Sequence, residues 1–493
     1  MTSPKSHGIT PGNDGASSPS VARELSSFAA GTSFLDLPRD VVLESKRILL
    51  DAVGCAVAAA ASTSNTKARA AVEFGEGFGG SDGSATIFGA TQRSSLYGAA
   101  FANGELINAL DYDAVLPPGH VSPYVLPGAL AVAEIDGASG QDLISAIAVA
   151  HEMSFRFGKA MDYIRDTKAG VVSWAPVLGY TSTVFGATAA VSRLRGAGSD
   201  VMCHALTIAA STTPVNSLRS WVEHTPASTI KYTMAGSIVH TALNASAMAA
   251  LGHNGDPGVL DDPEFGYPRF IGTKRWEPEA LVDGLGDKWH FQRANAFKHY
   301  PHCRALHGLL DLLTDSLEEN SIASEEITAI RAWGEGHTDR PVWLATEVGD
   351  PVEGQLSIAH GLAVGAQRLA PSRAWQDAST ISNPEVLRLM KLVTYETHPE
   401  WASAIATDPS ARPSRLEVEA RGEVFVSELR YPRGTPGSSH DLSMTDDELL
   451  SKFLVNTADS LGDRVANEVA DAIMRLDELP NVSSVLRSLG RVH

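Results

Sequence analysis

The first half of the chain is dominated by apolar stretches with helical spacing. Ala, Leu, Val and Ile recur every three or four residues, and strict alternation of apolar and polar positions, which marks a strand, is rare. The pattern predicts helices over residues 41–60, 96–110, 124–134, 143–161, 184–194 and 238–251, separated by Gly, Pro and Ser. Because these helices are apolar on most sides, we expect them to be buried against one another in a helical domain spanning residues 21–270.

The pattern changes after residue 254, where aromatic and charged residues become more frequent. Helical spacing returns over 303–318 and 384–393, whereas 327–333 and 415–425 alternate as strands do. We therefore predict a smaller α+β domain over residues 271–440. The fold class expected for the whole chain is mainly α, with one large all-helical domain and this smaller one.

The two ends of the chain differ in character. Residues 1–20 are rich in Ser, Gly and Pro and lack an apolar core, so we expect a disordered tail without a secretion signal. Near the other end, Ser443 or Thr445 is a candidate N-cap, because three acidic residues follow. Helices beginning there and over 465–476 and 482–489 should place residues 441–493 back on the helical domain.

Composition narrows the function. A chain of 493 residues predicts two or three domains. The net charge of −19 and the lack of a basic run argue against a nucleic-acid partner. Three cysteines without CxxC spacing indicate a reducing compartment, and no apolar run is long enough for a membrane span, so we expect a cytoplasmic protein with no membrane partner.

The strongest chemical candidate is a short polar segment between two predicted helices. It holds Asp111, Asp113 and His120, and its Pro117, Pro118 and Gly119 cannot continue a helix. A loop that carries Asp and His between buried helices can direct a general acid/base into a pocket. A capping Asp and a surface His explain the local pattern equally well.

Two lysines are candidates for binding an anion. Lys231 precedes an apolar helix, where the helix dipole disfavours a cation unless an anion is bound; a solvated lysine is the alternative. Lys298 lies at the predicted domain border, next to a cluster that includes His302 and His307. These histidines are five residues apart and miss the spacing of a helical metal pair, so we expect no metal and instead a polar wall around an anion.

With these residues identified, the chain resembles the MmgE/PrpD family, which includes 2-methylcitrate dehydratase and cis-aconitate decarboxylase. The resemblance runs from about residue 27 to 489. Its motifs occur in the family's order: Ala99–Gly104, Leu110–Asp113, His120–Ser122, Leu126–Ala129, then Glu152, Arg156 and Gly158, Lys231–Gly236, Phe297–Cys303, Gln355–Ile358 and Leu442–Phe453.

The resemblance implies both a fold and a site. Family members have a large helical domain completed by the C-terminal helices and a smaller α+β lid, form homodimers, and use no metal or organic cofactor. The active site lies between the domains. A small anionic carboxylate is the expected substrate.

The family's functional residues can be placed on this sequence. Its Asp falls on Asp111, its catalytic His on His120, and its two pocket lysines on Lys231 and Lys298. An aromatic residue of the lid falls near His337, which we expect to act as a second acid or base. We also expect Asp113 and Tyr300, which lie in two of the motifs, to contact the substrate.

Three departures from the family concern polar pocket positions. The chain has Ala114, Val115 and Leu116 after the acidic motif, no histidine in the segment 173–176, and Ala235 before the glycine of the lysine motif. The losses suggest a substrate with fewer carboxylates or with an apolar extension.

The main hypothesis is a cofactor-independent lyase, a dehydratase or decarboxylase, that moves a proton next to a carboxylate of a small di- or tricarboxylic acid. His120 would carry the proton, Asp111 would orient it, and the lysines would bind carboxylates. The alternatives are an isomerase or epimerase that uses the same residues, and a non-catalytic binding protein with this fold.

Overall fold

The computed structural model describes residues 20–79, 85–163, 165, 167–168, 171–172, 175, 177–214, 218–437 and 442–490. The predicted tail therefore lies outside the described residues except for Ser20, which caps the first helix. Most of the segment 173–176, one of the departures noted above, lies outside them as well.

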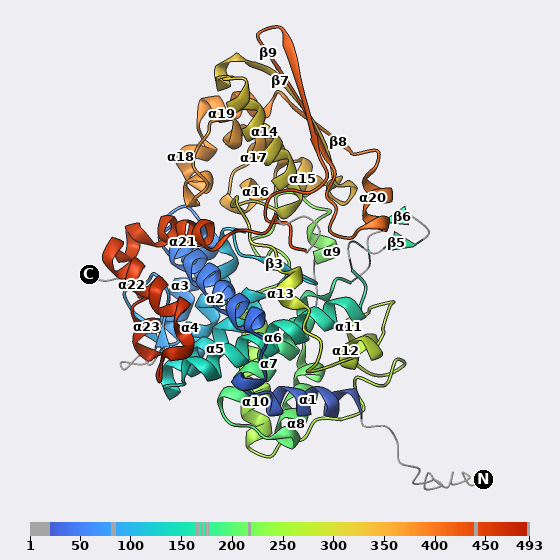
Figure 1. Ribbon diagram of the computed structural model, residues 1–493, viewed down its shortest axis with the longest axis vertical. Helices are drawn as coiled ribbons and strands as arrows, with labels where there is room; N and C mark the ends of the chain where they lie inside the picture. The colour runs from blue at the N-terminus through green and yellow to red at the C-terminus, as the bar shows by residue number, and fades with distance from the viewer. Residues whose placement is uncertain are drawn as a thin grey trace, which may run out of the picture.

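The predicted helices of the first half form one tightly packed body (Figure 1). Its helices are α1 (Val21–Gly31), α2 (Arg39–Ala60), α3 (Thr66–Gly77), α4 (Leu96–Ala109), α5 (Ser122–Asp136), α6 (Gly140–Ala160), α7 (Thr183–Leu194), α8 (Ser199–Thr212), α9 (Leu218–Trp221) and α10 (Ala235–Ala250). Small side chains such as Ala and Gly let α4, α5, α7 and α10 approach one another closely, and nearly every residue of α5 is buried. All six helices predicted from the apolar spacing are confirmed.

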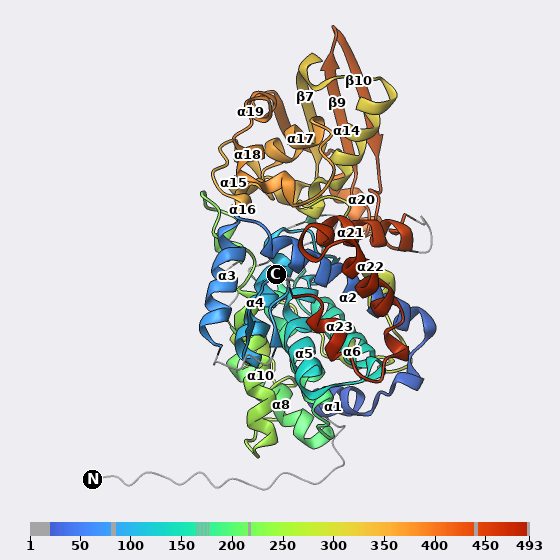
Figure 2. The ribbon, with the colours of Figure 1, turned by 90° about the vertical axis from the view of Figure 1, so that its left-hand side faces the viewer.

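The chain returns to this body at its C-terminal end. α21 (Asp446–Leu461), α22 (Asp463–Met474) and α23 (Ser483–Arg487) pack against α2 and α5, and Figure 2 shows them beside the N-terminal helices. Thr445, one of the two predicted caps, is the N-cap of α21 and forms a capping box with Glu448. Residues more than 300 positions apart in the sequence thus share one core.

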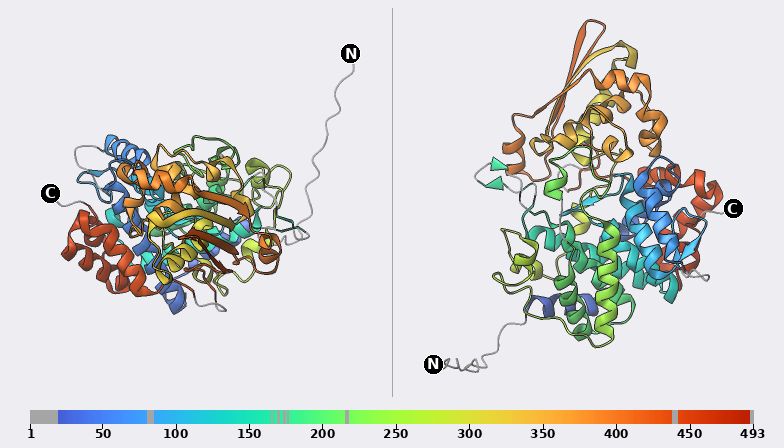
Figure 3. Two further views of the ribbon diagram at one scale, coloured as in Figure 1. Left: turned by 90° about the horizontal axis from the view of Figure 1, so that it is seen from above. Right: turned by 180° about the vertical axis from the view of Figure 1, so that it is seen from behind.

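The smaller part of the molecule is built on a four-stranded sheet in the order β10-β9-β7-β8. The strands are β7 (Ile327–Gly334), β8 (Val393–Thr397), β9 (Ser414–Ala420) and β10 (Glu423–Leu429); β8 runs parallel to β7, and the other pairs are antiparallel. Helix α14 (His307–Glu319) packs on the sheet, and α17 (Ile358–Ala366) packs against α14. Seen from above and from behind, this part sits over one end of the helical body (Figure 3).

Two predictions for this region need correction. The segment 415–425, predicted as one strand, is instead most of a hairpin, because Arg421 and Gly422 turn the chain with φ values of 56° and 78°. The helix predicted over 384–393 ends earlier, as α19 (Pro384–Met390), and Val393 begins β8. The hairpin was hidden because polar and apolar residues keep alternating through its turn.

Short elements complete the described chain. They are α11 (Tyr267–Ile271), α12 (Glu279–Val282), α13 (Phe291–Ala294), α15 (Pro341–Leu344), α16 (Pro351–Gly354), α18 (Ala378–Ile381), α20 (Trp401–Thr407), and the two-residue strands β1 (Ala85–Thr86), β2 (Arg93–Ser94), β3 (Val115–Leu116), β4 (Gly119–His120), β5 (Thr167–Lys168) and β6 (Val171–Val172). Within the described ranges, no helix has the length and apolar character needed to cross a membrane. The domain boundaries at residues 270 and 440 stay a prediction.

Candidate active site

The predicted Asp–His segment is a small hairpin between two buried helices. α4 ends at Ala109, β3 and β4 pair with each other, and α5 begins at Ser122. Val115 also exchanges both backbone hydrogen bonds with Ala296. The hairpin therefore fixes His120 between the helical body and the segment that leads to the sheet.

One nitrogen of His120 is bound by Asp113. Nδ1 of His120 lies 2.7 Å from Oδ2 of Asp113, and both side chains are buried. Asn108 Nδ2 lies 3.4 Å from the same carboxylate. A carboxylate at Nδ1 fixes the tautomer and orientation of an imidazole. The structure thus gives to Asp113 the orienting contact that was predicted for Asp111.

Asp111 is the centre of a buried charge cluster instead. Its carboxylate accepts hydrogen bonds from Lys231 at 2.9 Å, Lys298 at 2.8 Å and the Tyr232 hydroxyl at 2.9 Å. Burial by itself raises the pKa of Asp111, but the two ammonium groups outweigh burial and hold that pKa well below its usual range. The cluster holds two cations and one anion, next to Nε2 of His120, which lies 3.5 Å from Asp111.

The backbone is strained at this cluster. Asp111 and Lys231 are two of the five described non-glycine residues with positive φ, 52° and 59°, a region that costs an L-residue about 1–2 kcal/mol. Strained residues of this kind persist where the surrounding contacts over-determine them, as they do at functional sites. The two strained residues are ion-paired with each other.

Both predicted pocket lysines donate hydrogen bonds to buried protein acceptors. Lys231 also donates to the carbonyl oxygen of Asn108 at 3.0 Å and to the side-chain oxygen of Gln355 at 2.8 Å. Lys298 donates to both the carboxylate and the carbonyl oxygen of Asp111. Because neither side chain is exposed, direct contact with a substrate would require Asp111 to release them.

A cavity of about 410 Å³ opens directly in front of His120. The lining residues before position 300 are Val115, Leu116, Pro117, Gly119, His120, Phe155, Lys159, Tyr163, Arg165, Tyr180, Tyr232, Arg293, Ala294 and Ala296, and those after it are Cys303, Arg304, Ala305, His337, Trp343, Asp408, Pro409, Ser410, Arg412, Thr435 and Pro436. The size suits a small-molecule ligand. The cavity contains both predicted catalytic histidines, and the cluster around Asp111 lies behind its wall.

His337 lines the same cavity from the second half of the chain. It lies at η5 (Gly336–Thr338), directly after β7, and its Nδ1 is 3.1 Å from Oε2 of Glu335. Glu335 also pairs with Arg165 and Arg412. Sequence spacing could place His337 on the lid, but only the fold brings it to the cavity of His120.

Tyr300 does not belong to this site. Its hydroxyl donates to Asp311 at 3.0 Å, and Tyr300 lines a different hollow together with His299 and Trp375. Its motif neighbour Lys298 points the other way, toward Asp111. The structure therefore places Tyr300 outside the cavity of His120, and its contact with a substrate stays a prediction that this cavity does not support.

The histidine cluster after Lys298 is a set of structural contacts. His302 Nε2 bonds to the carbonyl oxygen of Ser357, and His307 contacts Arg304 and the carbonyl oxygen of His302. Burial lowers the pKa of His302 to about 3, which keeps that ring neutral. Across the part of the chain that the structure describes, no group of three His, Cys, Asp or Glu residues is arranged to hold a metal ion.

Two of the positions at which this chain departs from the family's polar residues lie in the cavity wall. Val115 and Leu116 line the cavity, and the rings of Tyr180 and Tyr232 continue the same wall, stacked with centroids 5.0 Å apart. His120 stacks on Tyr232 at 4.7 Å. One side of the cavity is therefore apolar and aromatic around the imidazole.

Sequence reasoning missed several of these residues. Tyr232, Asn108 and Gln355 bind the predicted residues, although Gln355 lies in a motif of the resemblance. It also missed the cavity's arginines, which come from separate segments and share no spacing. Adjacency to Lys231 was the one signal that could have identified Tyr232.

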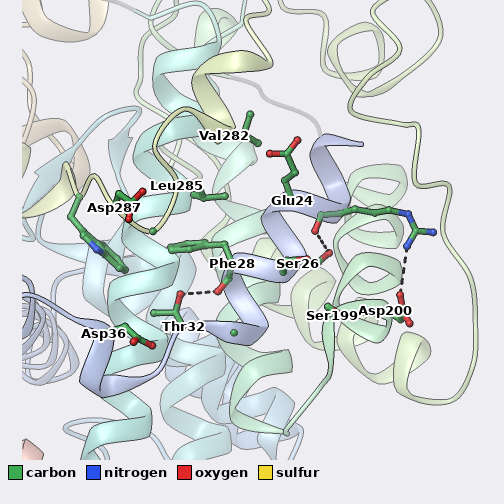
Figure 4. Close-up of a pocket in the computed structure, with 15 residues that line it drawn as sticks. Glu24, Ser26, Phe28, Thr32, Asp36, Ser199, Asp200, Val282, Leu285 and Asp287 are labelled. Atoms are coloured by element: carbon green, nitrogen blue, oxygen red, sulfur yellow. Dashed lines mark hydrogen bonds and ion pairs between the residues drawn. The ribbon is translucent and has the colours of Figure 1, made fainter. Parts of the chain in front are cut away.

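A second hollow, of about 900 Å³, lies between α1, α8 and the segment after α12 (Figure 4). Its charged lining is mostly acidic, with Glu24, Asp36, Asp200 and Asp287, and Arg23 pairs with Asp200 at 3.5 Å. None of the predicted site residues lines it. An acidic lining does not suit a carboxylate ligand.

Comparison with known proteins supports the family resemblance that the motifs indicate. The chain is 25% identical to cis-aconitate decarboxylase of Aspergillus terreus, with 95% of this chain and 96% of that protein covered. It is 23% identical to the cis-aconitate decarboxylase-like protein oryM of Aspergillus oryzae, with 94% and 96% covered. Residues 23–279 match the model of the MmgE/PrpD N-terminal domain, and residues 300–478 match that of the C-terminal domain. The chain, with its large helical body and small sheet domain, belongs to the MmgE/PrpD family.

Proposed function

We propose that this protein is a lyase that removes CO2 or water from a small di- or tricarboxylic acid by proton transfer at His120, without a cofactor. The observation that carries the proposal is the buried Asp113–His120 pair, 2.7 Å apart, which opens into a cavity shared with His337. The relatives named cis-aconitate decarboxylase support the class of reaction.

His120 would exchange the proton through Nε2, because Asp113 occupies Nδ1. In a decarboxylation, the bond between carbon and carboxylate breaks, its electron pair stays on the substrate carbon skeleton, and His120 delivers a proton to that skeleton as CO2 leaves. In a dehydration, His120 removes a proton next to a carboxylate, and a second acid, for which His337 is the candidate, protonates the departing hydroxyl. Both histidines line the same cavity, so both can reach a ligand that is bound there.

The cluster around Asp111 would act on the electrostatics of this step. Its two ammonium groups balance the carboxylates of Asp111 and Asp113, so that the imidazole of His120 works beside fixed positive charge that opposes a build-up of negative charge in the site. In this proposal Lys231 and Lys298 stabilise charge from behind the wall and fix Asp111. Direct contact with the substrate is assigned to the cavity lining instead.

The test is turnover by the purified protein. Incubation with cis-aconitate, citrate and alkyl-substituted citrates in D2O, followed by NMR, should show a new product. A decarboxylated product should carry deuterium on one carbon, and a dehydrated product should be an alkene that has lost one carbon-bound proton. His120→Ala should remove turnover while the protein still binds the acid, as judged by its thermal shift. Full activity in His120→Ala would refute the role of His120.

An isomerase or epimerase is the second candidate, because His120 and His337 both line the cavity and could serve two faces of one carbon. Product analysis separates the two: exchange of a carbon-bound proton with D2O without loss of CO2 or water favours the isomerase. If no carboxylic acid binds, the hypothesis of a non-catalytic binding protein replaces both enzyme hypotheses.

We also propose that the protein is a homodimer. An exposed aromatic face on α3 supports this, with Phe74 46% and Phe78 45% exposed although their rings pack together. His240 of α10 extends the same face. Exposed aromatic patches of this kind mark protein interfaces.

A further inference from the structure

Cations dominate the charged lining of the cavity. Five of them surround it, Lys159, Arg165, Arg293, Arg304 and Arg412, whereas Asp408 is the one carboxylate among the described lining residues. The chain as a whole carries a net charge of −19. A positive cavity in an acidic protein indicates a bound anion, and the contacts of Arg165, Arg304 and Arg412 indicate where that anion would be held.

Two of the arginines are paired with each other through one carboxylate. Arg165 and Arg412 both bind Glu335, and Arg165 also donates to the backbone carbonyl of Pro409 at 2.9 Å. The Arg412 side chain retains 19% of its exposure. Two guanidinium groups and one carboxylate have a net positive charge. Arg412 is partly exposed and lines the cavity, so this charge is accessible to a ligand there.

Arg304 is buried without an anion. Its guanidinium donates to neutral acceptors, the carbonyl oxygen of Arg433 at 2.8 Å and Thr435 Oγ1 at 3.2 Å, and lies 3.1 Å from Nδ1 of His307. Among the residues that the structure describes, no carboxylate lies within 4.0 Å of it. Burial, followed by the neighbouring Arg412, lowers the pKa of Arg304 to about 9, so that the group still carries its charge at neutral pH.

We propose that Arg304 and Arg412 bind a second carboxylate of the substrate, remote from the carbon that exchanges its proton with His120. A buried guanidinium is stabilised by a planar anion that it can bind in a fork. Both arginines line the same cavity as His120, together with His337 and Thr435, and come from a different part of the chain. The reacting carbon then lies against the stacked Tyr232 and His120, and the remote carboxylate lies under the sheet domain.

The inference deepens the proposed function and rests on it for the statement that the ligand is a carboxylic acid. It adds that Arg304 and Arg412 bind the second carboxylate of that acid and select for it. Leu116 and Val115, which face the same cavity, leave room for an apolar substituent near the reacting end.

Calorimetric titration with matched ligand pairs tests this selection. The pairs are succinate, glutarate and adipate, each against its monoamide, which keeps the shape and removes one charge. The wild-type protein should bind at least one diacid about tenfold or more tightly than its monoamide. Arg304→Gln and Arg412→Gln should each reduce that ratio to about twofold or less. Arg464→Gln, the same substitution on α22 outside the cavity lining, should leave it unchanged.

The possible results separate the inference from the proposed function. Equal binding of every diacid and its monoamide by the wild type, or an unchanged ratio in both folded variants, overturns the inference while leaving a lyase for monoacids open. A ratio that depends on Arg304 with no turnover of any acid supports the inference and contradicts the lyase. If Arg304→Gln does not fold, Arg412→Gln and Arg304→Lys, which keeps the charge but loses the fork, decide the question.

Discussion

At the scale of single residues, the chemistry depends on which carboxylate faces which atom of His120. Asp113 holds Nδ1 at 2.7 Å, and Asp111 holds two lysines and approaches Nε2 at 3.5 Å. The two acids of this short loop thus have separate roles. Asp113 fixes the tautomer of His120, and Asp111 pairs with the two buried lysines. Their neighbours, not their sequence positions, decide which task each performs.

Replacing Asp113 by Asn should lower kcat by roughly 10²–10⁴-fold, because the amide can donate to Nδ1 and favour the wrong tautomer. The binding of diacids should change little, since Asp113 is buried behind the imidazole. Steady-state kinetics measure kcat, and calorimetry measures binding. A variant with wild-type kcat would show that Asp113 does not orient His120.

The Asp111 cluster predicts a loss of stability in acid. The pKa of Asp111 is depressed in the folded protein, so its contribution is present above the unfolded-state pKa of about 3.9 and is lost as pH falls below that value. Urea unfolding at pH 7, 4 and 3 should give a smaller acid-induced loss for Asp111→Asn than for the wild type. Equal losses would mean that Asp111 is not ionised in the cluster.

At the scale of elements, the C-terminal helix α21 supports the site from a distance in sequence. Lys452 of α21 donates to Asp51 of α2 at 2.6 Å and to the carbonyl oxygen of Tyr112 at 2.7 Å, and Asp51 accepts from the backbone of Ala114. All four residues are buried. Helices α2 and α21 therefore hold the loop that contains Asp111 and Asp113 in place.

Lys452→Met should reduce the free energy of unfolding by about 3–5 kcal/mol, because it leaves the carboxylate of Asp51 buried without its partner. The double variant Lys452→Met with Asp51→Leu should recover much of that loss. Urea denaturation of both variants measures the effect. A loss below about 1 kcal/mol in Lys452→Met would show that the pair does not hold α21 in place.

The same scale shows what could be predicted from the sequence. The helices of the first half follow from their unbroken apolar spacing, and Thr445 was identifiable as a cap because Glu448 stands three residues later. The β9–β10 hairpin escaped detection because its turn is only Arg421 and Gly422. At the site, the motifs identified Asp111 and His120, but contacts such as Lys231 to Gln355 join segments more than 100 residues apart, which spacing cannot reveal.

At the scale of the whole molecule, the cavity lies where the helical body meets the sheet domain. Both parts of the molecule contribute cations to its lining. Lys159, Arg165 and Arg293 come from the same part as His120, and Arg304 and Arg412 come from the other part together with His337. The lining thus combines positive charge with an apolar and aromatic surface, which suits an anionic ligand that has an apolar portion. The proposed dimer would use a different surface, on α3 and α10.

Substituting Asp for both Phe74 and Phe78 should convert the proposed dimer to a monomer, because burying two added charges would oppose association. Light scattering coupled to size-exclusion chromatography measures the mass. Leu35→Asp, at a residue 90% exposed elsewhere on the surface, is the control and should leave the mass unchanged. A wild-type protein that elutes as a monomer at all concentrations would contradict the proposed dimer.

The central claim is proton transfer by His120 to or from a carboxylic acid, and NMR of the reaction in D2O tests it most directly. The wild-type protein, treated with a metal chelator and given cis-aconitate and a series of alkylated di- and tricarboxylates, should convert at least one acid. Loss of CO2 should leave deuterium at one carbon of the product, whereas loss of water should give an alkene that has lost one carbon-bound proton. His120→Ala should give no product. Failure of the wild type to convert or exchange any of these acids, or full conversion by His120→Ala, would contradict the claim.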